Sequence, residues 1–153
     1  MIKHFKDQGA FAPARCLGSI LAASFRQHYL ECGQYPDLLV PVPLHNQRLR
    51  QRGFNQSVCL ARTIQHKCGI PLLLSCCNRQ TGAHQQRGLG AQQRQLNMQG
   101  MFTAGRDAHL TGGRHIAIID DVVTTTATVN ALSQVLRQQG AARIDVWALA
   151  RVN

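Results

Sequence analysis

The stretch HIAIIDDVVTTTATVN, residues 115–130, constrains the fold of this chain more than any other part of it. Its apolar residues 116–119 predict a buried strand, which is followed by Asp120 and Asp121 and then by the run 124–128. In an open parallel sheet, ligands bind beyond the carboxyl ends of the strands. There a helix N-terminus offers free N–H groups and a positive dipole end to an anion. We therefore expect a phosphate site where this strand meets the next helix.

The residue types make the expected ligand more specific than a phosphate. Hydroxyl side chains donate hydrogen bonds to phosphate oxygens, whereas Asp120 and Asp121 accept them from sugar hydroxyls and bind magnesium directly or through water. The combination predicts a sugar phosphate. The alternative is that the two acids only end a strand and the threonines only cap a helix. Three consecutive threonines after an acid pair exceed what one cap requires.

Alternating strand and helix patterns predict an α/β fold with a mostly parallel central sheet flanked by helices, in one domain spanning residues 1–153. Asn55 and Gly69 are the expected start and stop of one helix. The segment 78–100 is rich in Gln, Arg and Gly and is expected to be a flexible loop or hood. Helices are expected over residues 12–30, 55–68 and 128–139, and strands over 38–44, 70–77, 116–119 and 143–150.

The charge is strongly positive, with 17 Lys and Arg against 7 Asp and Glu and a formal net charge of +10. Such a field attracts polyanions, either nucleic acid or phosphorylated small molecules, although a basic solubility surface is the simpler alternative. A loop is expected from Leu44 onward, so its arginines would lie just beyond a strand end. The candidate contacts for pyrophosphate or nucleic acid are Arg48 and Arg52 in that loop, with Arg50 between them, and Arg87 and Arg94 in the expected lid.

Cysteine spacing argues against a metal or disulfide framework, since the six cysteines include no C-x-x-C pair. We expect reduced thiols and no zinc site in this chain. No apolar run approaches the ~20 residues of a membrane helix, and Met1 is followed by charged residues without the pattern of a signal peptide. A cytoplasmic protein without membrane insertion is the expectation.

The stretch IAIIDDVVTTTAT resembles the phosphoribosyl pyrophosphate (PRPP) signature of type I phosphoribosyltransferases. That signature is an apolar strand, Asp-Asp, two apolar residues and Thr-Thr-Gly-x-Thr. The resemblance implies that Asp120 and Asp121 are catalytic residues that contact the ribose hydroxyls and help to bind magnesium. It also implies a 5′-phosphate loop made of Thr124, Thr125, Thr126, Ala127 and Thr128. Thr126 stands where that family has Gly, and a β-branched residue is costly wherever the backbone needs φ > 0.

Three further stretches resemble the ComF/GntX family of phosphoribosyltransferase-like proteins, which is associated with DNA uptake in competence. They are VPVPLHNQRLRQRGFNQS (40–57), QQRGLGAQQRQLNMQGMF (85–102) and IKHFKDQG (2–9), and with the PRPP motif they span nearly the whole chain. Members usually carry an N-terminal zinc-binding segment with paired cysteines, and we expect this chain to lack it. The family also implies a competence helicase as a partner.

These observations lead to three functional hypotheses. The first is a competence protein for DNA uptake and natural transformation that binds PRPP or a related phosphoribosyl ligand with magnesium, and also single-stranded DNA. The second is an active phosphoribosyltransferase, a pentosyl-transferring enzyme of nucleoside metabolism that joins ribose 5-phosphate to a nucleobase. No acid or lysine between Gln80 and Met101 offers a catalytic base for it. The third is a PRPP-sensing regulator, although no helix-turn-helix pattern is recognisable.

Overall fold

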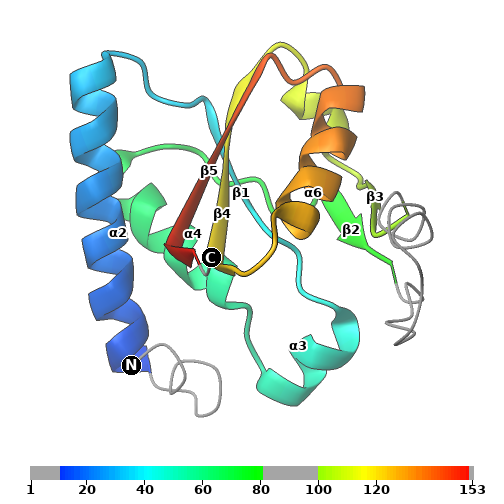
Figure 1. Ribbon diagram of the computed structural model, residues 1–153, viewed down its shortest axis with the longest axis horizontal. Helices are drawn as coiled ribbons and strands as arrows, with labels where there is room; N and C mark the ends of the chain where they lie inside the picture. The colour runs from blue at the N-terminus through cyan, green and yellow to red at the C-terminus, as the bar shows by residue number, and fades with distance from the viewer. Residues whose placement is uncertain (1–10, 81–99, 152–153) are drawn as a thin grey trace.

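The computed structural model describes residues 11–80 and 100–151, which form a parallel sheet with helices on both faces (Figure 1). The three-stranded sheet is accompanied by a separate two-stranded one. In chain order the elements are α2 (Phe11–Cys32), β1 (Leu38–Pro41), α3 (Asn46–Arg52), α4 (Gln56–Cys68), β2 (Cys77–Arg79), β3 (Phe102–Ala104), the 3₁₀ helix η1 (Ala108–Thr111), β4 (His115–Val123), α6 (Thr126–Gln138) and β5 (Arg143–Arg151).

The main sheet has the strand order β1-β4-β5, and both pairings are parallel. Leu39 of β1 pairs with Ala117 of β4, and Ile118 of β4 pairs with Val146 of β5. The α/β class and the mostly parallel sheet predicted from the sequence are therefore confirmed. All carboxyl ends of this sheet lie at the same edge, where a ligand site is expected.

The central strand β4 is apolar on both faces because helices cover both. Ile116 and Ile118 pack into a core with Leu132 and Leu136 of α6. Ala117 and Ile119 belong to a second core, formed with α2 and α4 on the opposite face. In Figure 1, α2 and α4 lie to one side of the sheet and α6 to the other. A strand that is buried on both faces has a continuous run of apolar residues, and residues 116–119 are such a run.

Helix α4 begins and ends at the predicted residues because local side-chain chemistry specifies both ends. The Asn55 side chain accepts a hydrogen bond from the Ser57 N–H at 2.9 Å. Gly69 has φ of 72°, in the left-handed region, and donates its N–H to the Gln65 carbonyl. An Asn N-cap and a left-handed glycine stop are the signals that the sequence contains.

The prediction of a strand over residues 70–77 is wrong. Leu39 and Leu72 form only an isolated parallel bridge, in which the Leu39 N–H donates to the Pro71 carbonyl. The chain then leaves the main sheet, and the carbonyls of Ser75 and Cys76 accept hydrogen bonds from the segment after β3. The apolar run is thus divided between two sheets, a division that no local pattern predicts.

The expected loop near Leu44 is present but ends at His45, because a short helix, α3, forms next and carries the arginines that were placed in the loop. His45 caps it by accepting the Gln47 N–H at 3.1 Å, and Gly53 ends it with φ of 74°. No residue of α3 is buried, so the helix is held by its caps and not by an apolar stripe. Because α3 has no periodic apolar residues, the sequence did not predict this helix.

Two short elements, the hood segment and the search for a membrane span remain to be compared with the predictions. The short elements β3 and η1 were not predicted, since three- and four-residue elements carry no periodic signal. Most of the expected hood, including Arg87 and Arg94, lies outside the described residues. Within residues 11–80 and 100–151, no helix combines the length and apolarity that a membrane span requires.

Candidate functional site

The acid pair lies within β4, near its carboxyl end, and not beyond the strand as the sequence predicts. Pairing with β5 continues past the acids, with Asp120 opposite Ala148 and Val123 opposite Arg151. Backbone pairing with a neighbouring strand therefore overrides the low strand propensity of Asp. The two carboxylates are fixed on the central strand, and the threonine run begins directly after it.

Asp120 is buried and is hydrogen-bonded to α4 and to the next residue of its own strand. Only 8% of the residue is exposed. Its Oδ1 accepts the Ser57 hydroxyl at 3.1 Å and the Asp121 N–H at 2.9 Å. Asp121 is partly exposed, and its Oδ1 accepts the Val122 N–H at 2.8 Å. Each carboxylate has a second oxygen and further lone pairs with which to bind a ligand.

Burial raises the pKa of Asp120 from its ordinary value of 3.8 to about 6. The neighbouring carboxylate of Asp121 raises it as well, whereas the hydrogen bonds from the Asp121 N–H and the Ser57 hydroxyl oppose the change. The charged form of Asp120 is thus disfavoured in the free protein. A bound cation, or hydroxyl groups that donate hydrogen bonds to the carboxylate, would stabilise the charged form of Asp120 again.

The N-terminus of α4 lies against the acid pair. Asn55 connects the helix to the end of β1, because its Nδ2 donates to the Val42 carbonyl at 3.0 Å. The Val42 N–H in turn donates to the Ile119 carbonyl of β4 at 2.9 Å. The next residue, Gln56, is only 2% exposed, and its side-chain Nε2 has no hydrogen-bond partner. This region therefore contains a buried donor that a ligand could satisfy.

The threonine run leads into α6 without a side-chain cap. Thr124, Thr125 and Thr126 are exposed, and Thr125 occupies the N-cap position with φ of −132° but makes no capping hydrogen bond through its side chain. The helix begins at Thr126, two residues earlier than predicted. Uncapped N–H groups at the start of a 13-residue helix are available to an anion.

Thr126 does not adopt the strained backbone that a glycine at this position would suggest. In the described segments, every residue with positive φ is a glycine, so Thr126 has an ordinary right-handed helical conformation. The conformational cost expected for a β-branched residue does not arise in this backbone.

The arginines of the site come from α3 and from β2. Arg48 is exposed and Arg52 partly exposed, both on α3. Arg79 of β2 lies near Arg48 and Asp120, and its guanidinium stacks over the Phe102 ring at 5.5 Å from the centroid. Burial lowers the pKa of Arg79, the charge of Arg48 lowers it further, and Asp120 opposes both. A half-buried guanidinium remains charged and needs an anion.

Sequence reasoning missed three residues of this site. Ser57 and Gln56 belong to the quoted stretch 40–57, but a serine and a glutamine at a helix start have no distinctive pattern. Arg79 has no sequence signal at all, because its electrostatic interaction with Asp120 joins residues 41 positions apart in the chain. The six cysteines are free thiols, as expected, and Cys76 and Cys77 are buried.

Comparison with known proteins finds curated relatives but no matching family model. The chain is 34% identical over 155 residues to Competence protein F of Haemophilus influenzae, covering 99% of this chain and 66% of that protein. It is 37% identical over 118 residues to DNA utilization protein YhgH of Salmonella typhimurium, covering 77% and 51%. It is 31% identical over 121 residues to Competence protein ComFC of Bacillus subtilis, covering 76% and 47%. The chain thus spans between about half and two thirds of these relatives.

Solved structures with the same fold are phosphoribosyltransferases. The glutamine PRPP amidotransferase of B. subtilis, complexed with ADP and GMP, matches with a TM-score of 0.57 at 19% identity, over 89% of this chain and 26% of that one. The hypoxanthine phosphoribosyl transferase of Trypanosoma cruzi matches with a TM-score of 0.55 at 17% identity, over 91% and 73%. At these identities the matches establish the type I phosphoribosyltransferase fold.

Proposed function

The chain belongs to the family of Competence protein F and ComFC, and from this premise we propose that it binds PRPP or a related phosphoribosyl ligand together with magnesium. It is a competence-type protein with a phosphoribosyltransferase fold. One observation carries the proposal: the uncapped start of α6 directly follows a strand that presents two adjacent carboxylates.

The geometry assigns each part of the ligand to a different group of residues. The 5′-phosphate would accept hydrogen bonds from the first N–H groups of α6 and from the exposed hydroxyls of the threonine run. The ribose hydroxyls would donate to Asp120 and Asp121. Arg48 and Arg79 would neutralise the pyrophosphate, which carries the densest negative charge of the ligand.

The two carboxylates suit magnesium, which typically binds one or two protein carboxylates together with phosphate oxygens and water. Asp120 and Asp121 would hold the ion, directly or through water. When bound, magnesium neutralises pyrophosphate oxygens and offsets the repulsion between the acids and the ligand. The elevated pKa of Asp120 supports this assignment, since a buried acid near a second acid favours a cation.

Isothermal titration of PRPP with and without magnesium tests this proposal. We expect magnesium-dependent binding that is lost when Asp120→Asn and Asp121→Asn are combined. Asp107→Asn is the matched control, because this acid lies in an ion pair with exposed Arg106, away from the site. Circular dichroism would establish that all variants are folded. Absence of PRPP binding at millimolar concentration, or equal binding by the double variant, would contradict the proposal.

Transfer of ribose 5-phosphate to a nucleobase is a second candidate activity. The observation in its favour is again the acid pair, because two adjacent carboxylates beside the ribose would stabilise the positive charge that develops at C1 as pyrophosphate leaves. The reaction would break the bond between ribose C1 and pyrophosphate and form a bond from C1 to a base nitrogen, whose proton passes to water. Release of pyrophosphate that depends on an added nucleobase would establish it. Binding of PRPP without release would leave a ligand-binding protein.

Single-stranded DNA binding is supported by the exposed basic surface of α3, where Arg48 and Arg50 are both exposed. With a net charge of +10 and 5% aromatic residues, such binding would be mainly electrostatic. Affinity for a short oligonucleotide should therefore fall steeply as salt concentration rises, and Arg50→Glu should weaken it. Arg114→Glu, at the opposite end of β4, is a control of equal charge. A nearly flat salt dependence would argue against this activity.

A further inference from the structure

Strand β5 is an exposed edge of the main sheet. It pairs along one side with β4 over its length, and no described strand pairs with its other side. It is nine residues long, and Val146 at its middle is 44% exposed. Figure 1 shows β5 at the front of the sheet, with α6 beside it. Proteins normally shorten, charge or cover an edge strand, because its free N–H and C=O groups invite pairing with another chain.

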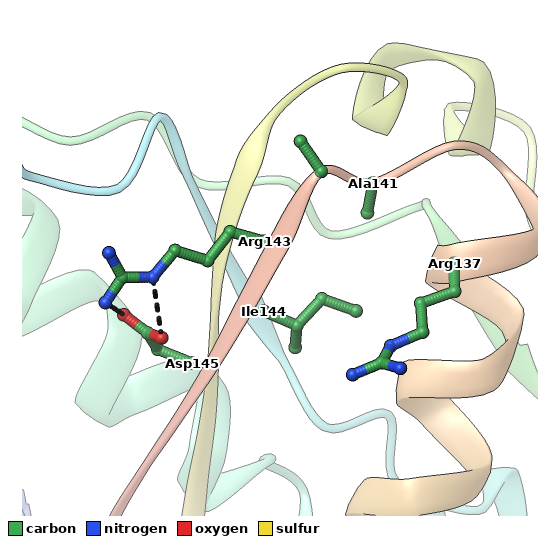
Figure 2. A pocket seen from close by; sticks show the side chains of 6 residues that line it. Arg137, Ala141, Arg143, Ile144 and Asp145 are labelled. Atoms are coloured by element: carbon green, nitrogen blue, oxygen red, sulfur yellow. Dashed lines mark hydrogen bonds and ion pairs between the residues drawn. The ribbon is translucent and has the colours of Figure 1, made fainter.

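Two hollows lie between β5 and α6 along the strand, and we refer to them together as the β5–α6 groove. One hollow of about 520 Å³ lies beside Ile144 and Arg137 (Figure 2). A second hollow of about 390 Å³ is lined by Val129 of α6 and by Val146 and Ala148 of β5, among others. Since alternate residues of a strand share one face, these side chains of β5 form a single apolar row along the groove.

The rim of the groove is positively charged. Arg137 extends from α6 beside the first residues of β5, and exposed Arg151 lines the hollow at the other end of the strand. The Arg143 side chain lies on the other side of β5 from Arg137, where it pairs with Asp145 (Figure 2). The acid in the lining, Asp145, is already engaged, because it accepts hydrogen bonds from Arg143 and from Tyr29. The Arg143–Asp145 pair is therefore mutually neutralised, and the charge available to a partner at this surface is that of the exposed Arg137 and Arg151.

This charge argues against a second copy of the chain as the occupant. If two β5 strands paired in parallel, Arg151 would lie near its equivalent in the second copy. If they paired antiparallel, Arg151 of each copy would approach the start of the other β5, beside which Arg137 lies. Like charges opposite each other destabilise paired strands. An acidic segment of another protein has the complementary charge at both ends of the strand.

We infer that the β5–α6 groove binds an extended, acidic segment of another protein, which adds to β5 as a further strand. Its backbone would pair with the free edge of β5. Apolar side chains at alternate positions would enter the two hollows, and carboxylates would contact Arg137 and Arg151. This surface is separate from the candidate sugar-phosphate site, and the inference does not depend on the proposed function.

Fluorescence anisotropy with synthetic peptides tests the inference on the full chain. The probe is a labelled peptide of about nine residues, the length of β5, in which valine and glutamate alternate. A second peptide of the same sequence has methyl groups on alternate backbone nitrogens, so that it cannot pair as a strand. We expect saturable binding of the first and at least about tenfold weaker binding of the second.

Two variants locate the binding surface. Val146→Asp places a charge in the apolar row, and Arg137→Glu reverses an exposed charge on the rim. Each should weaken binding by about tenfold or more. Arg62→Glu on α4, an exposed arginine on the opposite face of the sheet, is the matched control and should change affinity little. Thermal melting would establish that the variants are folded. If Val146→Asp is unstable, Arg137→Glu still tests the binding surface.

Four outcomes would overturn the inference. Failure of the first peptide to bind would do so, as would equal binding of the methylated peptide. Equal losses in Arg62→Glu and Arg137→Glu would indicate general attraction by a basic protein. A dimer in sedimentation that Val146→Asp dissociates would assign the groove to a second copy.

Discussion

Substitution of Asp120 by Asn is expected to stabilise the folded protein at neutral pH, because it removes a buried charge. The folded-state pKa of Asp120 is about 6, and its ordinary value is 3.8. A difference of about two pH units corresponds to roughly 3 kcal/mol at pH above both values. Asn has a similar shape and its Oδ1 can still accept from Ser57. We expect about 1–3 kcal/mol of added stability at pH 7.5.

The pH dependence distinguishes this effect from a packing change. Because the pKa of Asp120 is raised on folding, the folded state binds a proton more tightly than the unfolded state between pH 4 and 6. The contribution of this residue to stability is therefore greatest below pH 4, and it falls as pH rises through about 6. The difference between variant and wild type should be small near pH 4 and reach its full value above pH 7.

Urea denaturation followed by circular dichroism, at intervals between pH 4 and 8, measures this difference. Taking variant minus wild type at each pH cancels the titration of all other groups. Asp107→Asn, which removes a partly buried acid that pairs with exposed Arg106, is the control for the loss of one carboxylate outside the site. A constant difference for Asp120→Asn across the range, or a loss of stability above pH 7, would refute the assignment of Asp120 as a desolvated, electrostatically strained acid.

Three other substitutions have defined expectations. Gly105→Ala would place a methyl group against the Ser75 carbonyl and should cost about 1–3 kcal/mol in urea unfolding; Gly100→Ala, which meets no neighbouring atom, should cost much less. Tyr29→Phe removes the hydroxyl from two partly buried side-chain hydrogen bonds and should lower stability by about 1–3 kcal/mol, again measured in urea. Thr126→Gly should not raise PRPP affinity by more than about threefold in titration calorimetry, because Thr126 is already unstrained; a tenfold gain would show that the bound loop needs a glycine.

Local patterns in the sequence predicted much of the fold. The helix α4 has both caps at the predicted residues, Asn55 and Gly69, because capping depends on a few adjacent atoms. The buried strand at 116–119 was recognisable because burial on both faces requires a continuous apolar run. Where the local signal was weak or divided, as in α3 and residues 70–77, the prediction was wrong.

By itself, the sequence determined the α/β class, the buried run at the centre of the sheet, and the presence of the acid pair and the threonine run between that buried run and the following helix. These follow from periodicity and from residue types adjacent along the chain. Only the tertiary structure decided that Ser57 and Asp120 meet although 63 residues separate them, and that Arg79 lies near both Asp120 and Arg48. The same is true of the raised pKa of Asp120 and of the free edge of β5. Burial, electrostatic fields and strand neighbours arise from segments distant in sequence, whose approach no local pattern encodes.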